Sequence, residues 1–334
     1  MQNIINGLPI AAVILLLAVG FAFLVKGADF FVDGSSSIAK KLKVPPIIIG
    51  LTIVAMGTSL PETAVSVTAS LVQNNELAVS NVVGSNIFNL MFVIGVCSIL
   101  TPIMVQKATV VRDIPLSLGC ALLLLVLGIS GLGDKAGMTL GHADGVIFLI
   151  VFAGYIFTMV RSAMKARAAG QKVEIEGVEE CDNMKELSYG KSILFLIIGA
   201  AAIAFGGDLT VDSASRIAIE LGMSQTLVGL TIVSIGTSLP ELVTSIVAAR
   251  KNEVDMALGN AIGSNIFNIL MVLGIASAIS PMAIITENII DLCVLIVFTV
   301  CVWIFAGTKK KIGRVEGFCM VAFYAAYAIY IIVR

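Results

Sequence analysis

The sequence predicts an all-α polytopic membrane protein with ten transmembrane helices, arranged as two five-helix repeats of inverted topology. Of its 334 residues, 58% are hydrophobic and only 13% are charged, a composition outside the range of soluble domains. Apolar stretches of about 20 residues, enough to cross a hydrocarbon core roughly 30 Å thick, recur along the whole chain. The second half of the sequence also repeats the first.

Apolar runs bounded by charged residues, proline and glycine define the ten spans. Helices are expected in them because an open strand would leave its backbone groups unpaired in lipid. The predicted spans cover residues 8–34, 45–72, 77–100, 112–130, 143–162, 190–220, 224–250, 255–280, 287–306 and 315–333.

Basic residues set the predicted orientation. With both termini outside the cell, 17 of the 21 Lys and Arg residues fall in inward-facing segments, as the positive-inside rule requires. Residues 163–189 then form a cytoplasmic linker between a first repeat, residues 1–162, and a second, residues 190–334. The acidic run from Glu174 to Asp182 matches no EF-hand spacing, which favours a solvated linker over a calcium site. A short linker and no targeting signal favour the plasma membrane.

An internal duplication determines the architecture. Residues 50–100 and 229–279 align without gaps at an offset of 179, and 24 of the 51 positions are identical. GLTIVAMGTSLPE corresponds to GLTIVSIGTSLPE, and GSNIFN occurs in both halves. Because five spans is an odd number, the second repeat must enter the membrane inverted. Transporters built in this way bind their substrate near the midplane, where the repeats meet.

Each repeat contains a proline-interrupted helix with an acidic residue near mid-membrane. Pro61 removes a backbone donor and frees carbonyl groups near Gly57, and Glu62 adds a carboxylate. A charge at that depth is costly unless it is paired, and the neighbouring spans offer no buried basic residue. A metal ion is therefore the expected partner. Thr58 and Ser59 add hydroxyl oxygens beside Glu62. The second repeat has the same residues: Gly236, Thr237, Ser238, Pro240 and Glu241.

The following helix in each repeat adds further oxygens. Asn81, Ser85 and Asn89 are spaced four residues apart and share one helical face, with Asn86 beside them. Their equivalents are Asn260, Ser264, Asn268 and Asn265. Carboxylate, hydroxyl, amide and carbonyl oxygens suit calcium or sodium rather than zinc or copper. The two glutamates carry a charge of −2, which neutralises one calcium or two sodium ions and suits an exchanger.

Other polar residues have alternative explanations. Hydroxyls in membrane helices often bond to their own backbone, and this interpretation is favoured for Ser66, Ser245, Thr52 and Thr231. Asp29, Asp33, Asp208 and Asp212 either line an entrance, cap helix ends or bond to a loop. Packing does not explain a buried acid beside a proline in both repeats.

At GTSLPE and GSNIFN the sequence resembles the sodium/calcium exchanger family of the calcium/cation antiporters, in its prokaryotic type. The resemblance covers essentially the whole chain. It implies eight packed core helices, with the long first and sixth helices lying across them and sliding to expose the site alternately. It implies that Glu62 and Glu241 are the main calcium ligands and that Asn89 and Asn268 complete the central position. It also implies carbonyl ligands at Thr58 and Thr237, and sodium sites lined by Ser59, Ser85, Ser238 and Ser264.

The resemblance implies secondary antiport of calcium against sodium by alternating access, with both ions as cargo and no resident cofactor. The surroundings are membrane lipid, and neither nucleic acid nor an obligate protein partner is expected. Many members of the family have Asp at one of the positions of Asn89 and Asn268, so this chain has one carboxylate fewer. The driving ion therefore stays open between sodium, potassium and a proton. A cation channel is less favoured because no ring of subunits is implied, and no HExxH or GxSxG motif indicates an enzyme.

Overall fold

The computed structural model describes residues 5, 7–71, 75–130, 138–168, 187–223, 228, 232 and 234–334, and these residues are almost entirely helical. The helices of the first half are α2 (Ile10–Leu42), α3 (Pro46–Ile49), η1 (Gly50–Val54), α4 (Ala55–Thr58), α5 (Leu60–Leu71), α6 (Asn75–Ile87), η2 (Phe88–Val93), α7 (Ile94–Leu100), η3 (Thr109–Asp113), α8 (Ile114–Ser130) and α9 (His142–Ala168). Those of the second half are α10 (Tyr189–Glu220), α12 (Ser234–Gly236), α13 (Leu239–Arg250), α14 (Val254–Phe267), η5 (Asn268–Val272), α15 (Leu273–Ile279), α16 (Thr286–Lys309) and α17 (Arg314–Val333). The predicted all-α class is confirmed for this part of the chain.

Eight helical stretches among the described residues are long and apolar enough to cross a membrane. They are Ile10–Leu42, Ala78–Leu100, Thr109–Ser130, His142–Ala168, Tyr189–Glu220, Val254–Ile279, Thr286–Lys309 and Arg314–Val333. A ninth candidate is the pair Pro46–Thr58 and Leu60–Leu71, which is bent by 48°. The remaining predicted span, 224–250, begins outside the described residues and contributes α12 and α13. The total of ten stays a prediction.

Helix α2 continues to Leu42, well beyond residue 34, where the first span was predicted to end. The serines that follow residue 34, Ser35, Ser36 and Ser37, are buried and belong to the helix. The Ser37 hydroxyl accepts hydrogen bonds from the backbone N–H of Leu187 at 3.1 Å and from the Ser192 hydroxyl at 3.0 Å. Because these groups at the start of α10 satisfy Ser37, the polar stretch stays helical.

Helix α9 also exceeds its prediction, because it runs to Ala168 rather than to residue 162. Its last turn carries Lys165 and Arg167, whose positive charges are favourable at the negative end of a helix. The first residues of the predicted linker 163–189 are therefore helical. Residues 169–186, including the acidic run from Glu174 to Asp182, lie outside the described residues.

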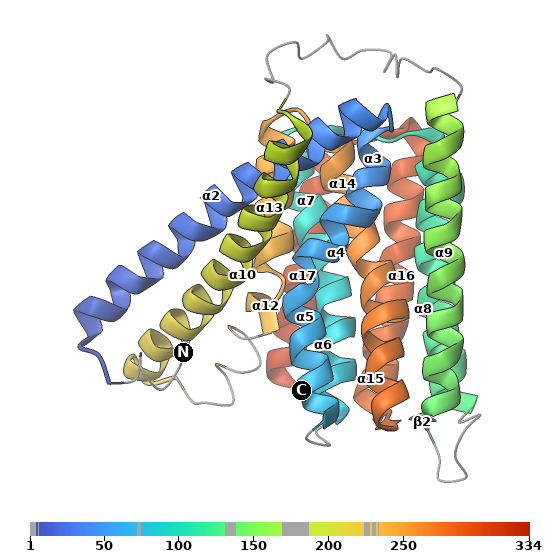
Figure 1. The fold of residues 1–334 in the computed structure, drawn as a ribbon. Coiled ribbons are helices and arrows are strands. Elements are labelled where there is room, and N and C mark those ends of the chain that lie inside the picture. The colour runs from blue at the N-terminus through green and yellow to red at the C-terminus, as the bar shows by residue number, and fades with distance from the viewer. Residues whose placement is uncertain are drawn as a thin grey trace.

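Helices α2 and α10 pack tightly in antiparallel directions and together lean away from the other helices (Figure 1). Gly20 lies against Gly206, and Gly27 lies against Gly199, so the contacts run in opposite directions along the two helices. A Cβ added at Gly206 would lie 2.7 Å from the backbone nitrogen of Leu24 and 2.8 Å from the carbonyl oxygen of Gly20. Only glycine allows the two backbones to approach so closely. The two helices form one closely packed unit.

The centre of the bundle consists of the stretches Ala78–Leu100 and Val254–Ile279. In each of them 78% of the most apolar window is buried, against 17–39% in the other six continuous candidates. Each contains a π-helical segment, η2 or η5, between two α-helical segments. Such π-bulges occur frequently at functional sites. The two stretches correspond to each other in the repeat, so both halves contribute equally to the interior.

Two short strand pairs connect the halves at the ends of the bundle. Strand β1 (Ile103–Met104) pairs with β4 (Lys311–Ile312), and β2 (Thr139–Leu140) pairs with β3 (Met282–Ala283), both antiparallel. In each pair one strand comes from the first half and the other from the second. The pairs thus hold the two halves together without contributing to the membrane core.

Candidate cation site

Both proline-containing helices are interrupted at the serine that precedes the Leu-Pro-Glu sequence. Helix α4 ends at Thr58, and Ser59 leaves the helical region with φ −82° and ψ 9°. Ser238 has nearly the same conformation, φ −93° and ψ 4°, before α13. Each proline then falls in the first turn of the next helix, where its missing N–H costs no hydrogen bond. The predicted breaks at Pro61 and Pro240 are confirmed.

The two breaks place Glu62 and Glu241 in the first turns of α5 and α13, both fully buried. The positive end of a helix favours a carboxylate at such a position. Each glutamate also accepts a hydrogen bond from the opposite half. The Ser59 hydroxyl donates to Glu241 Oε1 at 3.0 Å, and the Ser238 hydroxyl donates to Glu62 Oε1 at 3.3 Å. Ser264 donates to the same Glu241 oxygen at 3.3 Å.

Five oxygens of the predicted site are buried without a hydrogen-bond partner among the described residues. They are Glu62 Oε2, Glu241 Oε2, Ser85 Oγ, Asn89 Oδ1 and Asn268 Oδ1. A buried polar group without a partner costs about 1–3 kcal/mol, and a charged one costs more. Each of these oxygens can act as a ligand for a hard metal ion.

Glu62 and Glu241 have no basic partner among the described residues. None of the ion pairs within the described residues involves Glu62 or Glu241. Their hydrogen-bond donors are neutral hydroxyls, which leave the formal charge of the two carboxylates uncompensated. Two uncompensated charges in a hydrocarbon environment are strongly unfavourable.

Threonine and asparagine side chains surround this pair of acids. The Thr58 hydroxyl lies 3.0 Å from Asn260 Oδ1, and the Thr237 hydroxyl lies 3.3 Å from Asn81 Oδ1. The two asparagines in turn donate to serines whose hydroxyls were expected to bond to their own helix backbone. Asn81 donates to Ser66 at 3.2 Å, and the equivalent Asn260 donates to Ser245 at 2.9 Å.

Ser66 and Ser245 are therefore part of the polar network, contrary to the favoured interpretation. Their identity in the two repeats was the available signal, because each asparagine–serine pair recurs at the offset of 179. Thr52 does bond to its own helix, since its hydroxyl donates to the carbonyl of Ile48 at 2.7 Å. Thr231 lies outside the described residues.

All ten predicted site residues are at most 9% exposed. Hydrogen-bond contacts connect Thr58, Ser59, Glu241 and Ser264 in one group, and Glu62 with Ser238 in another. Thr237 belongs to the asparagine–serine network on the flank. Ser85, Asn89 and Asn268 lie buried in the two central stretches, where Asn268 donates to Asn86 Oδ1 at 3.2 Å.

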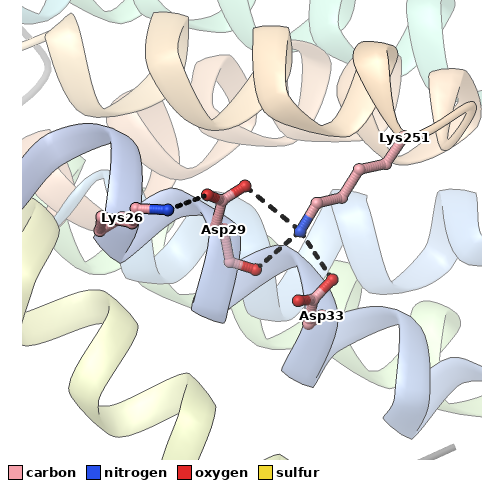
Figure 2. Close-up of polar contacts among 4 residues, drawn as sticks. All are labelled: Lys26, Asp29, Asp33 and Lys251. Atoms are coloured by element: carbon pink, nitrogen blue, oxygen red, sulfur yellow. Dashed lines mark hydrogen bonds and ion pairs between the residues drawn. The ribbon is translucent and has the colours of Figure 1, made fainter. Parts of the chain in front are cut away.

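The acidic residues of α2 bond to the turn that follows α13, which is one of the roles predicted for them, bonding to a loop. Lys251 Nζ lies 2.7 Å from Asp33 Oδ1 and 3.4 Å from Asp29 Oδ1, and it donates to the Asp29 carbonyl oxygen at 3.1 Å (Figure 2). Lys26 lies 3.8 Å from the other Asp29 oxygen. These residues lie inside α2, so they do not cap its ends; they join α2 to the end of α13. Asp208 and Asp212 likewise lie inside α10.

Comparisons with known proteins agree with this arrangement. Residues 12–161 and 191–333 match the family described as "Sodium/calcium exchanger protein". The chain is 38% identical over 319 residues to the putative antiporter CaxA of Alkalimonas amylolytica, which covers 92% of this chain and 95% of that protein. It is 34% identical over 339 residues to the sodium/calcium exchanger MaX1 of Methanosarcina acetivorans, covering 94% of this chain and 97% of the relative.

A solved structure of the sodium-calcium exchanger NCX_Mj, soaked with Na⁺ and Sr²⁺, is similar to this chain over its whole length. The two superpose with a TM-score of 0.80 and 33% sequence identity, over 95% of this chain and 98% of the other. Together with the family match, this similarity extends through both halves of the sequence and both copies of the buried Leu-Pro-Glu segment. The chain belongs to the sodium/calcium exchanger family.

Proposed function

We propose that this protein is a secondary antiporter that exchanges calcium against sodium by alternating access at the buried site. The observation that carries the proposal is the pair Glu62 and Glu241. Each carboxylate accepts a hydroxyl from the opposite half through one oxygen, and its second oxygen has no hydrogen-bond partner among the described residues. Both halves therefore contribute one available ligand to the same site.

The charge of the site accounts for exchange rather than simple binding. A charge of −2 is neutralised either by one calcium ion or by two sodium ions, so the two ions compete for the same carboxylates. Closing the site from both sides without any ion would leave two uncompensated carboxylates buried, and the cost of buried charge opposes this step. Occupancy by one ion or the other is thus needed for each conformational step, and this requirement couples the two fluxes.

We further propose that ten spans form two halves of inverted topology, residues 1–162 and 190–334. Contacts in the structure support this arrangement because they occur in reciprocal pairs related by the repeat. The Ser59–Glu241 and Ser238–Glu62 bonds are one such pair. The equivalent helices α2 and α10 also run antiparallel, as inverted repeats require.

The proposed orientation places both termini outside the cell and residues 163–189 in the cytoplasm. The distribution of Lys and Arg supports it, and the plasma membrane is the proposed location. Calcium leaving the cell as sodium enters is the direction that a normal sodium gradient would drive.

Calcium exchange against protons, or with a requirement for potassium, is the alternative. The specific observation in its favour is that Asn89 and Asn268 both carry amides, so the described site holds two carboxylates. With no third acid, protonation of Glu62 and Glu241 alone could replace the calcium ion.

Uptake of calcium-45 into proteoliposomes tests the proposal. Purified protein would face an outward sodium gradient, an outward proton gradient of equal size, a potassium gradient or none. Sodium-driven uptake that is lost in Glu62→Gln and Glu241→Gln, but kept in the exposed control Glu287→Gln, is the expected result.

Calcium uptake that is independent of the sodium gradient but driven by the proton gradient would identify the proton as the driving ion. A requirement for potassium in addition to sodium would select the potassium-dependent alternative. Uptake down the calcium gradient alone, without any counter-ion, would contradict antiport.

A further inference from the structure

Two equivalent asparagines, Asn86 and Asn265, bind each other's helices at the centre of the molecule. Asn86 Nδ2 donates to the backbone carbonyl oxygen of Asn265 at 3.2 Å, and Asn265 Nδ2 donates to the carbonyl oxygen of Asn86 at 3.0 Å. Both side chains are at most 1% exposed. They belong to the GSNIFN segments of the two central stretches and are related by the offset of 179.

These two bonds fix the direction in which each amide group points. A backbone carbonyl can only accept a hydrogen bond, so the NH₂ group of each asparagine must face it. The side-chain oxygen of Asn86 must then face the other way. Asn268 Nδ2 donates to that oxygen at 3.2 Å.

The bond to Asn86 also fixes the orientation of the Asn268 amide group. Because its NH₂ group is held by Asn86 Oδ1, its own oxygen must point away from Asn86. Asn268 Oδ1 is buried and has no hydrogen-bond partner among the described residues. It is one of the five oxygens available to a cation. If the amide turned over, it would present NH₂ hydrogens to the ion instead, which repel a cation.

We propose that Asn86 is a positioning residue that aims the amide oxygen of Asn268 at the transported cation. It acts through Asn268 and does not bind the ion itself. This inference rests on the proposed function, since it assumes that the buried oxygens hold the transported ion. It goes beyond that function because it assigns the orientation of a neutral ligand to a residue outside the predicted site.

The same bond network explains why position 268 carries an amide in this chain. Asn86 Oδ1 accepts a hydrogen bond from Asn268, and an ionised aspartate at position 268 has no donor to offer. Two acceptors would then face each other in a buried site. An asparagine at position 268 and the orientation of Asn86 are therefore matched to each other.

The structure supplies its own control, because the two asparagines differ in one bond. Asn265 makes the same contact with a backbone carbonyl, but its Oδ1 has no hydrogen-bond partner among the described residues. Asn265→Ala removes one bond between the central stretches, and Asn86→Ala removes two, its own bond to the carbonyl of Asn265 and the bond that it accepts from Asn268. Only Asn86→Ala also releases the amide of Asn268.

The test measures calcium KM and kcat for both variants in sodium-loaded proteoliposomes, and their thermal unfolding in detergent without ions. Both variants are expected to unfold below the wild-type temperature, and Asn86→Ala somewhat lower than Asn265→Ala because it loses one bond more. The calcium KM is expected to rise about tenfold in Asn86→Ala, the scale of leaving one buried polar group misdirected, and less than about twofold in Asn265→Ala. In an Asn268→Ala background, Asn86→Ala is expected to raise the KM no further.

Equal KM changes in the two variants would overturn the inference and leave the exchanger intact, because the asparagines would then be structural only. An undiminished effect of Asn86→Ala in the Asn268→Ala background would overturn it as well. If the wild-type protein itself shows neither calcium transport nor a calcium-induced rise in unfolding temperature, the proposed function and this inference both fail.

Discussion

The negative charges of Glu62 and Glu241 favour ion binding but destabilise the fold when no ion is bound. Substitution by glutamine keeps an oxygen that accepts the serine hydroxyl of the opposite half but removes the charge. An uncompensated buried charge destabilises a fold by several kcal/mol. Without ions, Glu62→Gln and Glu241→Gln are therefore expected to unfold at or above the wild-type temperature.

With calcium present, the order of stability is expected to reverse. The wild type gains the free energy of ion binding and unfolds at a higher temperature, whereas each glutamine variant loses most of this gain. Thermal unfolding in detergent, with calcium chloride and with a chelator, measures both effects on one sample. A lower ion-free unfolding temperature in the variants would mean instead that the carboxylates hold the fold together.

The sequence predicted which side chains form the buried site but not how they are oriented. Burial of Glu62 was predicted from its position midway along a span, and the repeat predicted the same for Glu241. The role proposed for Asn86 depends on a carbonyl group in the other half, 179 residues away. No local pattern indicates whether a carbonyl or a hydroxyl lies opposite an amide, so donor directions required the packed structure.

At the scale of single elements, the contact between α2 and α10 depends on glycine. A Cβ at Gly206 would meet two backbone atoms of α2 within 2.8 Å, and neither can move without displacing the helix. Gly206→Ala is expected to destabilise the protein by about 1–3 kcal/mol, the usual cost of overpacking. Its counterpart Gly27→Ala should behave alike, because its Cβ would lie 2.9 Å from the backbone nitrogen of Ile203.

Gly154 on α9 provides the matched control for this prediction. A Cβ added there meets nothing within 4 Å, so Gly154→Ala should gain up to about 1 kcal/mol from its better helix propensity. Denaturation in detergent compares the three variants directly. Equal behaviour of Gly206→Ala and Gly154→Ala would contradict the close approach of α2 and α10.

Element boundaries were harder to predict than the elements themselves. The breaks at Pro61 and Pro240 were predicted because proline has a strong local effect on a helix. The end of α2 was not, because the apolar run ends at Asp33 and Gly34, whereas Ser35, Ser36 and Ser37 beyond it are helical and buried in the structure. Of the three, Ser37 bonds to Leu187 and Ser192 at the start of α10, so this boundary depends on tertiary contacts.

At the scale of the whole molecule, the duplication was the most informative signal in the sequence. An odd number of spans in each repeat predicts inversion from parity alone. Reciprocal contacts, such as the asparagine–serine pairs Asn81–Ser66 and Asn260–Ser245, are the pattern that a two-fold relation between the halves would produce. The sides of the membrane on which equivalent residues lie provide an independent test.

Lys41 and Glu220 are equivalent positions in the last turns of α2 and α10, related by the offset of 179. Because the two helices are antiparallel, inversion predicts that these residues lie on opposite sides of the membrane. Lys41→Cys is expected to react with a membrane-impermeant maleimide only from the cytoplasmic side, and Glu220→Cys only from outside. The native cysteines, of which Cys293 and Cys319 are exposed, would first be replaced by serine.

Labelling in right-side-out and inverted vesicles distinguishes the possible topologies. Opposite labelling in the expected sense supports both the inversion and the positive-inside orientation. Opposite labelling in the reverse sense would keep the inverted repeat and overturn the placement of the termini outside. Labelling of both cysteines from the same side would contradict the inverted repeat itself. The antiparallel contact of α2 and α10 could then not arise from two equivalent helices that each cross the membrane once.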